Sequence, residues 1–143
     1  MKKIVISILT VALLVTTGCS IKKNQGDLGE KRVANTFDIT PKKISSSAIE
    51  GENQLITVDI EITNNDKGPL GIGAGDFFIR DEKGKETKIY GQRENFGEEL
   101  GKGKTLAGKA YFKVSTDYST FSLIYQPYQT IDAQWDNLQV PSK

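Results

Sequence analysis

Apolar and polar residues alternate along residues 55–63, and this pattern constrains the fold more than any other feature of the chain. The even positions carry β-branched aliphatic residues, namely Ile56, Val58, Ile60 and Ile62, and most odd positions are polar. Successive side chains of an extended strand point to opposite faces, so this period of two places one face on a hydrophobic core and the other in water. The segment is therefore expected to be a half-buried β-strand.

Other segments show strand patterns too. In 108–114, Ala110, Phe112 and Val114 alternate with Lys or Tyr, and in 131–136 the residues expected to face inward are Ile131, Ala133 and Trp135. Further strands are expected at 120–125, at 77–81 and 85–90 as a hairpin, and within 37–46 with an interruption at Pro41. About seven short strands without sustained helical periodicity predict an all-β, immunoglobulin-like β-sandwich.

The N-terminus has the pattern of a secretory signal. Lys2 and Lys3 precede the apolar run 4–15, which is interrupted only by Ser7 and Thr10. A helix needs about 20 apolar residues to cross a bilayer, so a run of this length, with its positive flank, indicates a signal peptide and not a membrane span. Residues 1–18 are expected to be removed.

The run ends in Leu-Val-Thr-Thr-Gly-Cys-Ser over residues 14–20, which resembles a lipobox. The resemblance implies cleavage after Gly18 and a diacylglycerol on Cys19, with the further acyl chains, such as palmitate, that anchor a lipoprotein. Thr16 stands where Leu is usual in such motifs. Release by an ordinary signal peptidase and a buried structural Cys19 are the alternatives. Apart from the covalent lipid, no cofactor is expected.

Composition divides the remaining chain into a tether and one domain. Residues 19–35 are polar and charged and are expected to form a flexible tether, and residues 36–143 the sandwich domain. Loss of residues 1–18 would leave 17 basic and 18 acidic residues, a formal net charge of −1. This balance, spread along the chain, excludes the clustered basic face that nucleic-acid binding requires.

Three blocks resemble a known family: residues 56–65 with their polar turn, the hairpin 77–85 (FFIRDEKGK), and 100–114 (LGKGKTLAGKAYFKV). Together they are similar to the immunoglobulin-like domain of unknown function found in Gram-positive bacterial lipoproteins, which is related in fold to a secreted mycobacterial immunoglobulin-like antigen. The resemblance covers nearly all of 36–140. It implies a sandwich fold, and the family has no agreed catalytic residues to carry over to this chain.

The residues available for chemistry argue against an enzyme. The chain has no histidine and one cysteine, so catalytic triads, thiol catalysis and His-ligated metals are excluded. The adjacent carboxylates Glu98-Glu99 and Asp81-Glu82 are interpreted as solvated surface charges. The glycine-rich segment 71–75 lacks the spacing and following helix of a dinucleotide loop, and is expected to be a flexible crossing between sheets.

Candidate binding residues lie in the turns. Tyr118 and Tyr128 flank turns and are expected to be exposed binding residues, whereas Phe121 and Tyr125 share a parity expected to face the core. The oxygen-bearing residues Asn64, Asn65, Asp66 and Asp76 could ligate calcium, but their spacing does not match a calcium loop. No metal site is predicted.

These patterns together predict a function set by location. The chain is expected to be a non-enzymatic binding or adaptor lipoprotein on the extracytoplasmic face of the cell membrane, with an envelope protein or glycan as partner. The alternatives are a carrier of a small ligand or carbohydrate, and a surface-exclusion or immunity factor.

Overall fold

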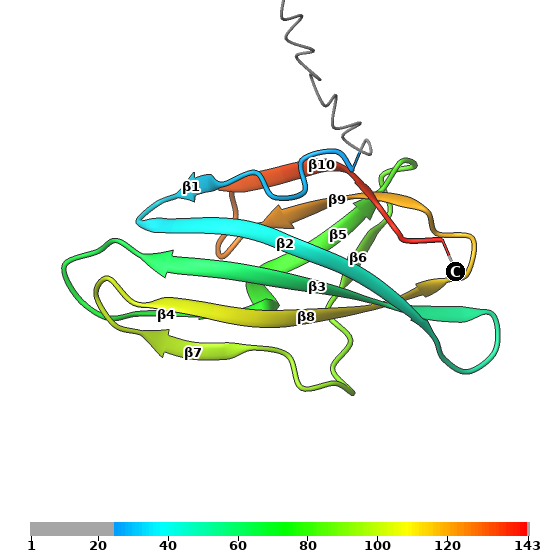
Figure 1. The fold of residues 1–143 in the computed structure, drawn as a ribbon, viewed down its shortest axis with the longest axis horizontal. Helices are drawn as coiled ribbons and strands as arrows, with labels where there is room; N and C mark the ends of the chain where they lie inside the picture. The colour runs from blue at the N-terminus through cyan, green and yellow to red at the C-terminus, as the bar shows by residue number, and fades with distance from the viewer. Residues whose placement is uncertain (1–24, 143) are drawn as a thin grey trace, which may run out of the picture.

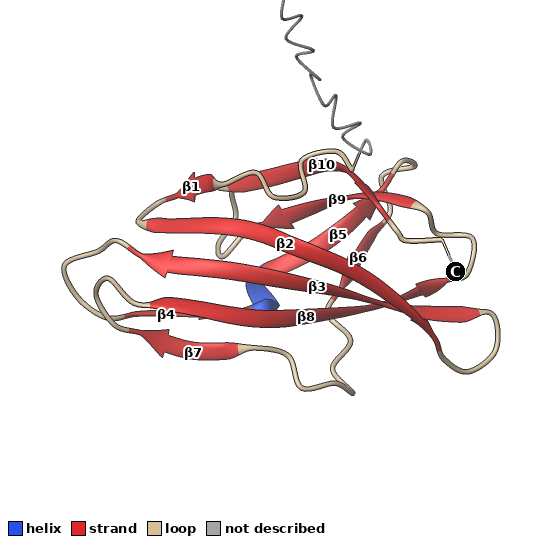
Figure 2. Cartoon of the chain, viewed as in Figure 1, coloured by secondary structure: helices blue, strands red, loops and turns tan. Residues whose placement is uncertain are grey.

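The computed structural model describes residues 25–142, which form two facing antiparallel β-sheets (Figure 1). The strands are β1 (Arg32–Ala34), β2 (Phe37–Ala48), β3 (Asn53–Asn64), β4 (Leu70–Gly73), β5 (Phe77–Asp81), β6 (Glu86–Lys88), β7 (Gly97–Leu100), β8 (Thr105–Ser115), β9 (Thr120–Tyr125) and β10 (Ala133–Gln139). One turn of 3-10 helix, η1 (Ala74–Asp76), lies between β4 and β5; it is the one helical element of residues 25–142 (Figure 2).

The strands form two four-stranded sheets and a separate two-stranded ribbon. One sheet has the order β1-β2-β3-β8 and the other β10-β9-β5-β6, while β4 pairs with β7 in a separate ribbon. Every pairing is antiparallel. The expected immunoglobulin-like sandwich is confirmed. The described residues contain ten strands instead of about seven, because β1, β4 and β7 are too short to show an alternating pattern.

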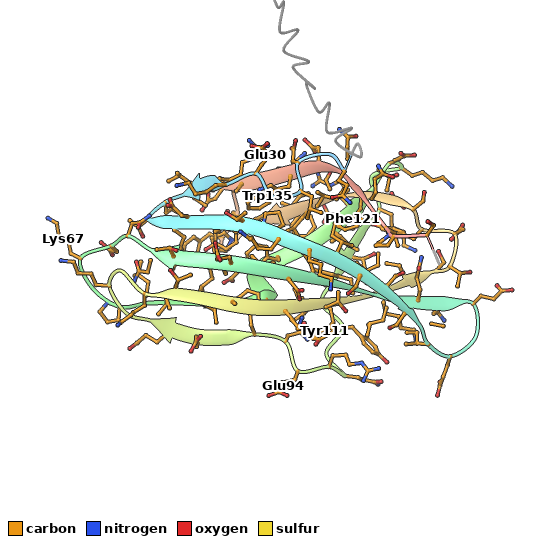
Figure 3. All side chains as sticks on the ribbon, in the orientation of Figure 1. Glu30, Lys67, Glu94, Tyr111, Phe121 and Trp135 are labelled. Carbon is orange, nitrogen blue, oxygen red and sulfur yellow. The ribbon has the colours of Figure 1, made fainter. Side chains whose placement is uncertain are left out.

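The alternating residues fill the space between the sheets. The four apolar even positions of β3 are at most 1% exposed, and Ala110 and Phe112 of β8 are fully buried beside them. The opposite sheet contributes Phe121 and Trp135, which lie between the layers in Figure 3, while Lys67 and Glu94 project from the surface. Burial of such side chains stabilises the fold by about 1.5–3 kcal/mol each.

The start of the folded domain differs from the expected one. Arg32–Ala34 forms β1 on the edge of the first sheet, and the backbone N–H of Asp27 donates to the carbonyl oxygen of Asp136 over 3.0 Å. The expected tether over 19–35 is therefore wrong for residues 25–35, which pack on the domain although they are largely polar. Polar groups of Asp27, Glu30 and Arg32 form hydrogen bonds with β10. Residues 19–24 and the signal peptide lie outside the described residues.

Three strand expectations also need correction. β2 continues past Pro41, where its register against β3 shifts between Pro41 and Lys43. β10 begins at Ala133, and Ile131 is 44% exposed instead of facing the core. The glycine-rich segment is not a flexible crossing, because Gly71 and Gly73 pair with Glu99 and Gly97 of β7.

Candidate functional site

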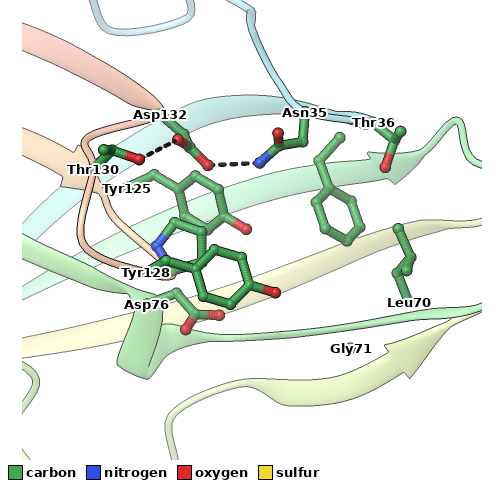
Figure 4. Close-up of a pocket in the computed structure, with 11 residues that line it drawn as sticks. Asn35, Thr36, Leu70, Gly71, Asp76, Tyr125, Tyr128, Thr130 and Asp132 are labelled. Carbon is green, nitrogen blue, oxygen red and sulfur yellow. Dashed lines mark hydrogen bonds between the residues drawn. The ribbon is translucent and has the colours of Figure 1, made fainter.

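A cleft of about 440 Å³ opens where the β1–β2 turn, β4, η1 and the β9–β10 loop meet (Figure 4). The residues lining it are Asn35, Thr36, Phe37, Leu70, Gly71, Asp76, Tyr125, Pro127, Tyr128, Thr130 and Asp132. Loops and strand ends carried by a rigid scaffold are common positions for binding residues. We therefore consider this cleft the candidate site.

Asp132 is held in place by groups from three segments. Its Oδ2 accepts a 2.6 Å hydrogen bond from Nδ2 of Asn35, and its backbone N–H donates to the carbonyl oxygen of Tyr125 over 3.0 Å. Thr130 Oγ1 lies 3.5 Å from the other carboxylate oxygen. Asn35 adopts a positive φ of 53°, a conformation that Asn tolerates better than most residues, and this turn brings its amide to Asp132.

Asp76 is positioned by the short helix. The backbone N–H of Gly73 lies 3.3 Å from Oδ2 of Asp76, which closes the turn of η1. The carbonyl oxygen of Asp76 accepts a 2.8 Å hydrogen bond from the backbone N–H of Gln126, directly after β9. Because both ends of the turn are tied, the Asp76 carboxylate lies at the cleft beside the end of β9 (Figure 4).

Tyr125 forms the inner wall of the cleft. The residue is only 3% exposed, and its ring packs against Phe77 with a centroid separation of 4.8 Å. Its hydroxyl points into the cleft, and no other lining residue hydrogen-bonds to it (Figure 4). Burial, with smaller effects of the nearby Asp76, Asp132 and Tyr128, raises the pKa of the Tyr125 phenol. The hydroxyl is thus a neutral donor and acceptor at physiological pH.

The cleft is acidic and partly aromatic. Asp76 and Asp132 bring two carboxylates, no lining residue is basic, and neither carboxylate takes part in an ion pair within residues 25–142. Tyr128 is 82% exposed at the rim. The arrangement can accept hydrogen bonds from a ligand and cover it with an aromatic ring.

The two predicted binding tyrosines lie apart. Tyr118 precedes β9 and Tyr128 follows it, so they lie at opposite ends of this strand. Tyr128 is exposed at the cleft, as expected. Tyr118 is half-buried against Phe121, with a hydroxyl that is buried without a hydrogen-bond partner, so the expected exposure is wrong. Burial and the nearby Asp81 raise the pKa of the Tyr118 phenol.

The four oxygen-bearing residues that could ligate calcium do not gather around one point. The Asn64 amide donates to the carbonyl oxygens of Gly68 and Leu100 and accepts from the N–H of Asp66, so its polar atoms serve the loop. Asp76 lies at the cleft. Within residues 25–142, no group of three or more Cys, Asp or Glu side chains could hold a metal ion.

Sequence patterns missed most of the cleft. The alternating pattern correctly predicts that Tyr125 is buried in the core, but it does not show that the Tyr125 hydroxyl faces the cleft. No sequence pattern indicates Asp132 as a cleft residue beyond its position after a turn. Gly18 and Cys19 lie outside the described residues. Among the residues described, no helix has the length and apolar character needed to span a membrane.

Comparison with family models places the chain among domains of unknown function. A family model described as "Domain of unknown function (DUF4352)" matches residues 23–134. The comparison with curated proteins finds no match.

Solved structures show the same fold at low sequence identity. The secreted protein MPT63 of Mycobacterium tuberculosis is 17% identical with a TM-score of 0.63, over 78% of this chain and 95% of that one. A candidate lipoprotein of Bacillus subtilis, ycdA, is 14% identical with a TM-score of 0.58, over 77% of this chain and 38% of that one. The Bacillus subtilis yjhA protein is 15% identical with a TM-score of 0.55, over 78% and 97%.

Proposed function

The chain belongs to the DUF4352 family of domains of unknown function, and from this premise we propose that it is a non-enzymatic binding or adaptor module on the extracytoplasmic face of a membrane. One observation carries the proposal. At the loop end of a filled sandwich, the hydroxyl of Tyr125 and the carboxylates of Asp76 and Asp132 open onto one cleft, beside the exposed ring of Tyr128. Such convergent polar groups on an aromatic wall are typical of a recognition site.

The interior favours recognition at the surface over transport of a ligand between the sheets. Trp135, Phe77, Phe112 and Phe121 are among the largest fully buried side chains and occupy the space that a carrier would need for its ligand. The absence of histidine from the sequence also removes the side chain best suited to proton transfer near neutral pH. The filled core thus argues against a carrier, and the lack of histidine argues against acid–base catalysis.

The sequence before residue 25 supports the location. The signal-like run and the lipobox-like residues Gly18 and Cys19 resemble those of an exported lipoprotein. A secreted protein and a candidate lipoprotein are among the structures with this fold. Acyl chains contribute about 0.8 kcal/mol per buried methylene, so two or more give stable anchoring. The packed domain begins near residue 25, so a chain from Cys19 reaches at most about 20 Å. The domain would thus lie close to the membrane surface.

The anchor has a direct test. Cells expressing the native chain or a Cys19→Ala variant are fed a radiolabelled fatty acid and then extracted by detergent phase separation. The native protein is expected to carry label and enter the detergent phase, while the variant remains unlabelled. A native protein without label would contradict the lipid anchor.

The binding role is tested by crosslinking in cells followed by affinity capture. The native protein is compared with Tyr128→Ala, which alters the cleft rim, and with Tyr111→Ala, a partly buried tyrosine of β8 that does not line the cleft. We expect a specific envelope component to be captured by the native protein and by the Tyr111 variant, and capture to fall with Tyr128→Ala. Equal capture by all three proteins would contradict recognition at this cleft.

A further inference from the structure

We propose that the cleft binds a basic side chain, a lysine ammonium or an arginine guanidinium, of a partner polypeptide whose apolar residues contact the cleft rim. This inference rests on the proposed binding function and names the class of its ligand. Its starting point is that neither Asp76 nor Asp132 has an oppositely charged partner within residues 25–142.

The charge of the cleft favours a cation. The side chains of Asp76 and Asp132 lie at one cleft without a lysine or arginine among the lining residues. A hydrogen bond from a charged donor to a carboxylate is about twice as strong as one between neutral groups. A neutral sugar would leave both charges uncompensated, whereas an ammonium or guanidinium brings the opposite charge into the cleft.

The buried phenol supplies an independent indication. Tyr125 is 97% buried with its hydroxyl directed into the cleft, and none of the lining residues hydrogen-bonds to it (Figure 4). An ammonium group has three donors and no acceptor, so it can donate to the phenolic oxygen and to carboxylates together. The exposed ring of Tyr128 stands at the rim, where aromatic faces attract cations.

The rim indicates that the cation belongs to a polypeptide. Within residues 25–142 the exposed large hydrophobic side chains are Val33, Tyr128 and Ile131, at 66%, 82% and 44% exposure. Tyr128 lines the cleft, Ile131 lies between two lining residues, and Val33 lies two residues before the lining Asn35. A free amine or an inorganic cation bound in the cleft would leave the side chains of Val33 and Ile131 exposed to water. Apolar residues that flank a lysine or arginine would contact these apolar groups.

The test is an NMR titration of the folded domain with capped peptides. The probes are acetyl-Leu-Lys-Leu-amide and acetyl-Leu-Arg-Leu-amide, and the matched control is acetyl-Leu-norleucine-Leu-amide, which lacks the ammonium group of lysine. A neutral N-acetylglucosamine oligomer is titrated in parallel. We expect one or both basic peptides to shift the amides of Gly71, Thr130 and Asp132 saturably. The shifts should weaken as salt rises, because these charges are partly exposed.

Variants separate charge from structure. Asp132→Asn should weaken binding of the basic peptide about five-fold or more. Glu82→Gln is the control: it also removes one negative charge, but Glu82 follows the last residue of β5, at the end away from the cleft, so binding of the peptide should be unchanged. Tyr128→Leu should weaken it about two- to five-fold, and Tyr128→Phe, which keeps the aromatic face, should retain it. Amide spectra of the free variants confirm that they are folded.

Three other outcomes of the titration would contradict the inference. If the norleucine peptide binds as tightly as the basic peptides, or if only the sugar shifts the cleft amides, the ligand class is wrong while recognition at the cleft stands. If no probe shifts these amides, the basic-ligand inference fails. The proposed function fails with it only if capture in cells is also insensitive to Tyr128→Ala.

Discussion

The indole N–H of Trp135 donates a 2.7 Å hydrogen bond to the carbonyl oxygen of Glu30, and the two residues lie side by side in Figure 3. Trp135 is a fully buried residue of β10, whereas Glu30 precedes β1. Arg32 adds a second link, because its Nε donates to the carbonyl oxygen of Gln134 over 3.0 Å. Together these contacts fasten the beginning of the domain to a core strand.

Trp135→Phe should lower the free energy of unfolding by about 2–4 kcal/mol, because it removes the indole donor and leaves a cavity in the core. Urea denaturation followed by circular dichroism measures the change. Ile131→Ala, an exposed site before the same strand, should stay within about 0.5 kcal/mol of the native protein. A Trp135→Phe cost no greater than that of the control would show that the contact contributes little.

Gly26→Ala should loosen the N-terminal segment. Gly26 has a φ of +61°, and an added Cβ would lie 2.2 Å from the carbonyl oxygen of Asn137. Gly29, with a φ of +87° and open space around it, is the matched control. We expect Gly29→Ala to cost about 1–2 kcal/mol from backbone strain alone and Gly26→Ala to cost more. Hydrogen exchange at the Asp27 amide should accelerate selectively with Gly26→Ala.

Asn64→Ala should destabilise the protein by about 2–4 kcal/mol. The fully buried Asn64 amide bonds to the carbonyl oxygens of Gly68 and Leu100, and its removal leaves these groups without partners. The adjacent Asn65 is exposed, so Asn65→Ala should change the stability by no more than about 0.5 kcal/mol. Thermal or urea unfolding of the pair distinguishes them, and similar values for both would contradict the role of the Asn64 amide.

Stability should fall above about pH 10 because of Tyr118 and Tyr125. Burial raises the pKa of both phenols in the folded protein, while an unfolded tyrosine titrates near pH 10. Above that pH the unfolded state has lost protons that the folded state retains, so the free energy of unfolding decreases by about 1.4 kcal/mol per pH unit for each such group. Below that pH the two phenols contribute no slope.

Tyr125→Phe tests this assignment. The variant keeps the buried ring and removes the ionisable group, so its stability should decline less steeply above pH 10 than that of the native protein. Urea midpoints measured from pH 7 to 11 give the two slopes, and their difference removes the effect of lysine titration common to both proteins. Parallel slopes would contradict a raised pKa at Tyr125.

The longer strands follow from the sequence because alternation is a local property of an extended backbone. The expected ranges 77–81 and 120–125 coincide with β5 and β9, and the inward positions of β3 are all buried. The short strands β1 and β4 could not be recognised, since three or four residues show too little alternation and Gly71 and Gly73 have no side chains to contribute. Residues 25–31 look like a polar tether until their partners on β10 are known.

The sequence by itself determined the sandwich class, the inward faces of the long strands and the exposed position of Tyr128 beside a turn, because each depends on neighbours a few residues away. Only the tertiary structure decided the cleft. Asn35 and Asp132 form a hydrogen bond across 97 residues of chain, and Asp76 reaches the end of β9 through Gln126. Such contacts depend on which strands pair and in which register, and this is set by packing of the whole core rather than by any local pattern.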